Sequence, residues 1–235
     1  VEHEISIRSA KNVVSNVVES LYQVNTVGIS KAGDWFLVTD ISKPITEGHP
    51  IALRLSSTNP ALIVISTGKE IKFEVAFPVL HGTDGEDGSV QGLLKTINIP
   101  IIGSGVLGSA QAMDKITTKR LLDQSGIPTA PYLTLNENSA LCFDDIKDKL
   151  GVPFMIKAGN QGSSVGISKV TDEASFAAAC KNSFSYSSQI LAESFVSGRE
   201  LECRCHVCLF GRDSQLLSCR RITPDTGLSG RLERQ

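Results

Sequence analysis

A glycine- and serine-rich loop over residues 159–166 contains residue types that suit phosphate chemistry. Glycines lack a Cβ, so backbone N–H groups in such a loop can approach phosphate oxygens closely. The loop has no Gly-Lys-Ser/Thr ending and does not open a helix, which separates it from Walker and dinucleotide-binding loops. Ser163 and Ser164 are its candidate phosphate-binding side chains. A plain hairpin turn is the alternative interpretation.

Two lysines could neutralise phosphates beside this loop. Lys157 ends an apolar strand just before the loop, and Lys115 lies in an expected helix that would face the same cleft. The alternative for Lys157 is a surface lysine whose stem covers apolar neighbours. The alternative for Lys115 is an i,i+4 partner of Lys119 or Gln111 on a solvated helix face.

A third feature has the pattern of an adenine-binding hinge. An apolar strand end would offer backbone amides to adenine, and Glu200, further along the chain, could accept ribose hydroxyls. The hinge residues assigned to the nucleotide are Glu193, Ser194, Phe195 and Val196. Each feature alone is also explained by ordinary structure, but their order along the chain favours a nucleotide site.

The elements that must position these residues predict a fold with α/β and α+β parts. Strands over 62–65, 72–80 and 99–102 and helices over 9–21, 87–97 and 109–125 alternate as in a parallel α/β sheet. Strands over 132–135, 153–158, 165–170 and 190–196, with helix 172–184, indicate a separate small α+β module. The predicted domains are therefore 1–125, 126–190 and 191–235.

Composition limits the class of protein. The 235 residues are 41% hydrophobic and 20% charged with a net charge of −2, as in soluble globular proteins. No basic surplus predicts a nucleic-acid or membrane partner, and no apolar run approaches the roughly 20 residues that span a bilayer. Six cysteines without a secretory signal are expected to be thiols. A zinc site among those at 203–208 is a weak alternative, because C-x-C-x-x-C is not a paired C-x-x-C site.

Residues 81–92 are the most specific stretch of the chain. They read H-G-x-x-G-E-D-G-x-x-Q-G at every fixed position, which resembles the first signature of the D-alanine–D-alanine ligases, an ATP-grasp family. Segments similar to the family's are also found at 1–6, 103–105, 113–115, 162–166 and 198–203. The resemblance covers about residues 1–203. It implies an N-terminal α/β domain, a central ATP-grasp lid subdomain over 126–190 and the start of a C-terminal ATP-grasp domain.

The resemblance also implies an activity. It is the cytoplasmic, ATP-dependent joining of two D-alanines through an acyl phosphate, for peptidoglycan synthesis, by a homodimer. Glu2 would hold the ammonium of the first D-alanine, and Ser163 would link the glycine-serine loop to Glu2 through hydrogen bonds. His81 would lie near the reacting carboxylate. Lys115 and Lys157 would bind the ATP phosphates.

The chain departs from the family at both ends. The strand and Gly-Gly turn expected before Glu2 are missing, and Ala158 stands where the family usually has proline. Residues 204–235 lack the family's carboxylates for Mg²⁺ (or Mn²⁺), because Asp213, Asp225 and Glu233 are too far apart in sequence. We therefore expect no metal ligands, a largely missing C-terminal domain and, after a reading-frame slip near Cys203, a tail without a fold.

Two functional questions stay open at this point. A catalytically inactive fragment that retains at most partial nucleotide binding is the alternative to an active ligase. The second substrate, which could be D-alanine, D-lactate or D-serine, depends largely on residues that the sequence does not contain.

Overall fold

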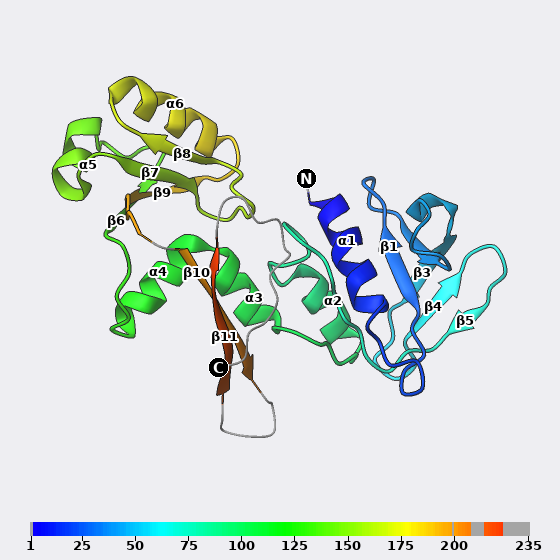
Figure 1. Cartoon of the computed structure of the whole chain (residues 1–235). Coiled ribbons are helices and arrows are strands. Elements are labelled where there is room, and N and C mark those ends of the chain that lie inside the picture. The colour runs from blue at the N-terminus through cyan, green and yellow to red at the C-terminus, as the bar shows by residue number, and fades with distance from the viewer. Residues whose placement is uncertain (1, 199, 208–213, 223–235) are drawn as a thin grey trace. The chain divides into compact units, whose positions relative to one another are not determined.

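The computed structural model describes residues 2–198, 200–207 and 214–222 (Figure 1). The chain divides into two compact units, residues 1–194 and 195–235. The first unit contains two sheets of five and four strands, and the second contains a two-stranded sheet.

A five-stranded antiparallel sheet forms early in the chain. Its strands follow one another in sequence order as β1 (Thr26–Ile29), β2 (Trp35–Val38), β3 (His49–Arg54), β4 (Ala61–Val64) and β5 (Glu70–Ile71), with the short 3-10 helix η1 (Ile45–Glu47) before β3. Buried Ile51, Leu62 and Val64 form the centre of its core. The connections between successive strands are short, and such connections allow antiparallel pairing only.

The prediction of a parallel sheet is therefore wrong, although the prediction of a mixed α/β fold is confirmed. Residues 72–80, expected to be a strand, lie outside the named strands, and the strand expected over 99–102 reduces to an isolated parallel bridge between Ala76 and Ile101. The Ala76 amide donates to the Pro100 carbonyl and the Ile102 amide to the Ala76 carbonyl, each at 2.9 Å. Within the described residues, this bridge is all that remains of parallel pairing.

Helix α1 (His3–Val14) lies earlier in the chain than the helix predicted over 9–21. Its apolar pattern runs on to Leu21, but the helix ends before that residue, and Leu21 is exposed. Ser15 and Asn16 use their side chains to donate to the Asn12 carbonyl, an interaction that competes with further helical hydrogen bonds. The shift places Glu2 at the start of the helix, where it can face a site.

The helix expected over 109–125 is two helices. Helix α3 (Val106–Met113) ends at Asp114, whose extended backbone breaks the helix, and α4 (Lys115–Gln124) begins directly after it. Asp114 caps α4 by accepting the Thr117 amide at 2.6 Å. The preceding helix α2 (Ser89–Thr96) agrees with the prediction. The break at Asp114 makes Lys115 the first residue of a helix.

Replacing Asp114 by alanine is expected to lower the free energy of unfolding by about 1 kcal/mol, because the Thr117 amide loses its acceptor. Urea denaturation followed by circular dichroism measures this change. Asp114→Asn keeps a capping oxygen and should stay close to the parent protein. Equal losses in both variants would contradict a capping role.

The second sheet has the order β6-β9-β7-β8, and all its pairs are antiparallel. Its strands are β6 (Tyr132–Asn136), β7 (Phe154–Ala158), β8 (Ile167–Val170) and β9 (Gln189–Ser194). Helices α5 (Phe143–Leu150) and α6 (Glu173–Phe184) pack against one face, where Ile146 and Ala179 join the buried core. Most of these elements were predicted. β9 ends at Ser194, the last residue of the first compact unit, and the predicted domain boundary at 190 stays a prediction.

The second unit contains an antiparallel strand pair, β10 (Glu200–Val207) and β11 (Ser214–Ile222), with an irregularity between Arg204 and Cys205. The prediction of a tail without a fold is therefore wrong for the described part of residues 204–235. The two strands stabilise each other, because the backbone N–H and C=O groups of each form hydrogen bonds with those of the other. The tail carboxylates Asp213, Asp225 and Glu233 lie outside the described residues.

Candidate active site

The signature loop over residues 81–92 is held in shape largely by hydrogen bonds among its own residues. Glu86 accepts the Gly82 amide at 2.7 Å, and Asp87 accepts the amides of Asp84 and Ser89 at 2.9 and 3.0 Å. Burial raises the pKa of Asp87, but these hydrogen bonds outweigh it and hold that pKa below its usual value. The loop is thus fixed by its own carboxylates.

Three glycines of the loop sit where a side chain would not fit. Gly82 and Gly88 have φ of +88° and +100°, in the left-handed region that favours glycine. A Cβ on Gly88 would lie 2.8 Å from the Val106 carbonyl oxygen, and one on Gly85 would lie 2.5 Å from the Leu80 Cβ. Buried Gln91 then donates to the Gly85 carbonyl at 2.9 Å. The signature therefore encodes a particular loop shape.

His81 is held against helix α1. Its amide donates to the Ser6 hydroxyl at 2.9 Å, and its Nε2 lies 3.0 Å from the Ser9 hydroxyl in a second hydrogen bond. On the other side of the ring, Nδ1 lies 3.6 Å from a Glu86 oxygen. Both ring nitrogens thus have partners within the protein, so His81 orients the loop as well as facing the pocket.

Glu2 is the carboxylate on which this loop converges. Its residue is only 9% exposed, at the N-cap position of α1. A Cβ on Gly82 would lie 3.5 Å from Glu2 Oε1, and a Cβ on Gly162, in the glycine-serine loop, would lie 3.6 Å from the same oxygen. The carboxylate therefore lies between the two loops that the sequence singled out.

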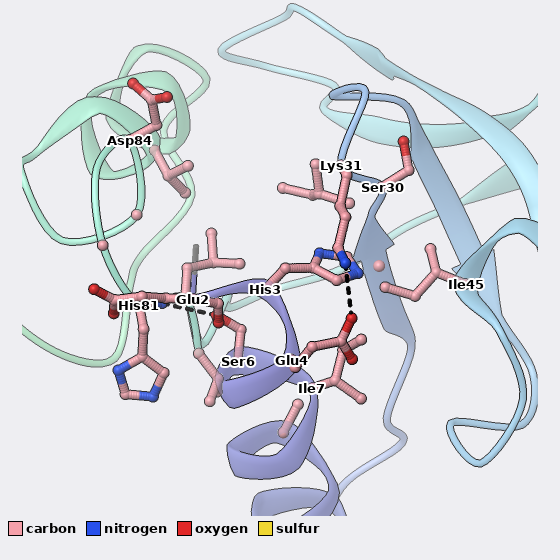
Figure 2. A pocket seen from close by; sticks show the side chains of 18 of the residues that line it. Glu2, His3, Glu4, Ser6, Ile7, Ser30, Lys31, Ile45, His81 and Asp84 are labelled. Carbon is pink, nitrogen blue, oxygen red and sulfur yellow. Dashed lines mark hydrogen bonds and ion pairs between the residues drawn. The ribbon is translucent and has the colours of Figure 1, made fainter. Parts of the chain in front are cut away.

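A pocket of about 760 Å³ opens around this end of α1. Figure 2 shows Glu2, Ser6 and His81 together on one side of the helix, and Glu4 on the side toward β1, where it pairs with Lys31 at 3.0 Å. The glycine-serine loop supplies Gln161, Gly162 and Val165 to the pocket wall. A buried carboxylate in a pocket of this kind can bind a small cationic group.

Glu2, His81 and Glu86 form one group that could hold a metal ion, which the sequence did not predict. Their potential ligand atoms lie within 4.8 Å of one another. One ligand would be an imidazole nitrogen, and Glu86 already accepts the Gly82 amide. Mg²⁺ prefers oxygen ligands in an octahedral arrangement, so this group does not fit it.

The glycine-serine loop joins β7 to β8, as predicted. Ser163 and Ser164 have φ of +44° and +64°, an uncommon conformation for residues other than glycine. Both are exposed, and the pocket is lined by their neighbour Gly162. The structure therefore brings the loop backbone to Glu2, whereas the hydrogen-bonded link through Ser163 stays a prediction.

Lys115 ties helix α4 to the same loop. Its amide donates to the Gly159 carbonyl at 2.8 Å, and its ammonium donates to the Gln161 carbonyl. Burial, followed by the neighbouring Lys157 ammonium, lowers the pKa of Lys115 below its usual value. The two lysines singled out by the sequence therefore lie close enough to repel each other.

Strand alternation directs Lys157 away from the hydrophobic core. Phe154, Ile156 and Ala158 of β7 are fully buried, so Lys157 points to the opposite face of the sheet. There its ammonium pairs with Glu193 of β9. Lys157 lies opposite Leu191 in the register, which makes Glu193 its diagonal neighbour.

Lys119 is a third lysine at this site, and sequence reasoning did not assign it to the nucleotide. Its ammonium pairs with the second oxygen of Glu193 and donates to the Ala130 carbonyl at 3.0 Å. It also lies 5.3 Å from the centre of the Tyr132 ring. Lys119 follows Lys115 by one helical turn, and that spacing was the available signal.

Glu193 is therefore a nearly buried carboxylate between two ammonium groups. Burial raises its pKa, but the hydrogen bonds from Lys119 and Lys157 outweigh burial and hold the pKa below its usual value of 4.5. The neighbouring residue Ser194 has both of its donors engaged, the amide with Pro131 and the hydroxyl with Leu150, each at 2.9 Å.

The lowered pKa of Glu193 predicts a pH dependence of stability. The paired carboxylate stabilises the fold fully above pH 4.5, and this contribution is lost as the pH falls through the lower folded pKa. The difference in unfolding free energy between the parent protein and Glu193→Gln should therefore shrink as the pH is lowered below 4.5. Urea titrations of both proteins at several pH values measure it, and a constant difference would contradict the pairing.

The remaining predicted nucleotide residues, Phe195, Val196 and Glu200, belong to the second unit. Phe195 and Val196 are exposed there, and Glu200 begins β10. The adenine hinge and the ribose carboxylate accordingly stay predictions.

Two family models match the chain. Residues 1–104 match the family described as D-ala D-ala ligase N-terminus, and residues 121–229 match D-ala D-ala ligase C-terminus. The second match extends past Cys203, where the sequence analysis placed the end of the resemblance.

Individual relatives agree. The D-alanine–D-alanine ligase of Shouchella clausii is 39% identical over 242 residues, covering 96% of this chain and 64% of that protein. The structure of the D-alanine–D-alanine ligase from Coxiella burnetii has a TM-score of 0.86 at 31% identity and covers 94% of this chain and 67% of that one. The VanG D-Ala:D-Ser ligase structure from Enterococcus faecalis has a TM-score of 0.85 at 27% identity and covers 100% and 70%.

The chain therefore belongs to the D-alanine–D-alanine ligase family, as the resemblance at residues 81–92 indicated. It spans 62–64% of the length of the first curated relatives. Among the helices in the described part of the chain, none combines the length and apolar content needed to cross a bilayer.

Proposed function

We propose that this chain takes part in the ATP-dependent joining of two D-alanines for cell-wall synthesis, and that it carries the site for the first D-alanine and part of the site for ATP. The observation that carries the proposal is the buried Glu2 carboxylate between the signature loop and the glycine-serine loop. A buried carboxylate requires a cationic partner, and the ammonium of an amino acid supplies one.

In the proposed reaction, a carboxylate oxygen of the first D-alanine attacks the γ-phosphorus of ATP, and ADP leaves. The amine of the second D-alanine then attacks the carbonyl carbon of the acyl phosphate. The amine loses a proton, the C–O bond to the phosphate breaks, and D-alanyl-D-alanine and inorganic phosphate are released.

The residues of this chain would bind and orient the reactants. Glu2 would fix the first D-alanine by its ammonium, while Lys115 and Lys157 would bind ATP phosphates and offset their charge during transfer. Gly162, the residue before Ser163, lies beside Glu2, which supports a hydrogen-bonded link from the Ser163 hydroxyl to this carboxylate when the site is occupied. His81, held by Ser9, would stand near the reacting carboxylate.

The family uses ATP and a divalent metal ion. The group formed by Glu2, His81 and Glu86 does not suit Mg²⁺, because one of its ligands would be the His81 imidazole nitrogen and Mg²⁺ prefers oxygen. In addition, Glu86 already accepts a hydrogen bond from the Gly82 amide. Among the described residues we therefore assign no ligand to this metal ion.

Phosphate release from ATP by the chain, with Mg²⁺ and with or without D-alanine, tests the proposal. We expect release that depends on D-alanine, together with ATP binding in a separate titration. Binding of ATP without such release would favour the alternative of an inactive nucleotide-binding fragment. Absence of both would contradict the proposal. D-serine or D-lactate added as the second substrate decides specificity, a question that the likeness to a D-Ala:D-Ser ligase makes pertinent.

We also propose a cytoplasmic homodimer, as the family resemblance implies. Analytical ultracentrifugation of the chain measures its oligomeric state, and a monomer at all concentrations would contradict the dimer.

A further inference from the structure

We propose that Lys119 is a positioning residue of the nucleotide site, which keeps Glu193 compensated so that Lys157 can leave that carboxylate for a phosphate oxygen. The inference rests on the proposed function, because that function assigns Lys157 to the ATP phosphates. It adds a residue that touches neither phosphate nor D-alanine and acts through Glu193.

Lys119 is locked in place by several groups at once. Its side chain is 13% exposed, and its ammonium contacts the Glu193 Oε1 atom, the Ala130 carbonyl and the face of the Tyr132 ring. The Tyr132 hydroxyl is in turn fixed by donating to Asp123 at 2.7 Å. A lysine with this many fixed partners serves as a permanent counter-charge.

Lys157 is placed differently, although it shares the same carboxylate. Its side chain is 24% exposed, and its ammonium contacts the Glu193 Oε2 atom. It is the last residue but one of β7, just before the glycine-serine loop. Lys157 is therefore the more accessible of the two lysines and, along the chain, the one next to that loop.

The energetic argument concerns what happens to Glu193 when Lys157 turns to a phosphate. Its side chain is only 12% exposed, and a nearly buried carboxylate without a counter-charge is strongly unfavourable. With Lys119 on its other oxygen, Glu193 stays paired throughout. Without Lys119, binding phosphate through Lys157 would leave the carboxylate alone, so Lys157 would stay on Glu193.

The test measures dissociation constants of the whole chain for ATP and for adenosine. Lys119→Met should weaken ATP binding by about tenfold or more and leave adenosine binding nearly unchanged. Glu193 itself belongs to the proposed adenine hinge, so the double variant is compared with Glu193→Gln alone. In that background Lys119→Met should change ATP affinity little, because no carboxylate is then left unpaired. A loss as large in the Glu193→Gln background as in the parent chain would overturn the proposal and indicate a structural or general charge effect.

Two control variants distinguish a positioning role of Lys119 from an effect of the substitution on folding. Lys119→Arg keeps the ion pair and should bind ATP like the parent chain. Lys147→Met removes a lysine that also has a carboxylate partner and an aromatic ring nearby, Asp144 and Phe143, but is 50% exposed. It should change neither ligand's affinity. A defect in Lys119→Arg equal to that of Lys119→Met would overturn the proposal.

A second readout distinguishes failure of this inference from failure of the proposed function. Amine-reactive labelling with peptide mapping reports how often Lys157 is free of Glu193, with no nucleotide present. Lys119→Met should slow labelling of Lys157, and the double variant should accelerate it. If the parent chain binds ATP no better than adenosine, the assignment of Lys157 to the ATP phosphates fails. If labelling of Lys157 is the same in the parent chain and in Lys119→Met, the role of Lys119 in positioning Lys157 is overturned.

Discussion

Replacing Glu2 by glutamine is expected to weaken D-alanine binding by about 30-fold to 4,000-fold, because truncating one member of a buried charge pair costs about 2–5 kcal/mol. Glutamine has nearly the same shape, so the pocket between Gly82 and Gly162 should persist. Only the negative charge that compensates an ammonium is lost. Isothermal titration with D-alanine, in the presence of a non-hydrolysable ATP analogue, measures the change.

Glu4 provides the matched control for this experiment. It lies two residues further along α1 and lines the same pocket, but it is 73% exposed and faces Lys31. Glu4→Gln should therefore leave D-alanine affinity within a factor of about two, because exposed ion pairs contribute little. Equal effects of the two substitutions would show that the pocket responds to its overall charge and would remove the special role of Glu2.

The sequence singled out several residues that the structure brings together around Glu2, but it did not predict the contacts that hold them in place. Residues 81–92 pointed to a family through their pattern, but Glu86, Asp87 and Gln91 prove to be loop-building residues. Such contacts are local, yet they depend on backbone directions that a pattern does not specify. His81 likewise needs Ser6 and Ser9, far away in the chain, to hold it.

Lys119 shows why part of a site escapes sequence reasoning. Its spacing from Lys115 suggests an ordinary helix surface, and the partner that gives it a role is Glu193, on a strand that follows much later. The pairing exists because β9 lies between β6 and β7 in the second sheet. Strand order in a sheet is a long-range property, so the spacing from Lys115 could draw attention to Lys119 but could not reveal its pairing with Glu193.

The two sheets differ in how well they were predicted. The second was predicted because its strands are apolar and bounded by turn signals. Of the first sheet, the strand expected over 62–65 is confirmed as β4, whereas the other four strands were not predicted. β1 is intermediate in burial throughout and β5 has two residues, so neither leaves a clear apolar pattern. With so few of its strands predicted, the first sheet was wrongly expected to be parallel.

Gly85→Ala is expected to lower the free energy of unfolding by about 1–3 kcal/mol, the usual range for overpacking a filled site. The added Cβ would lie 2.5 Å from the Leu80 Cβ and 3.2 Å from the Leu80 carbonyl carbon and oxygen, so backbone must move. Because Gln91 holds the Gly85 carbonyl, the displacement should pass through the loop toward Gly82 and Glu2. D-alanine binding should therefore fall together with stability.

Gly108→Ala is the control, because the same atom is added where there is room for it. The nearest atom to its Cβ would be the Ser104 Cβ at 3.8 Å, and the residue lies in helix α3. Alanine is the better helix former, so the variant should gain about 0.5–1 kcal/mol of stability and bind D-alanine unchanged. Thermal and urea unfolding of both variants decide the matter. A tolerated Gly85→Ala would mean that the loop can relax around Leu80, and that the glycine at this point of the signature is not required by packing.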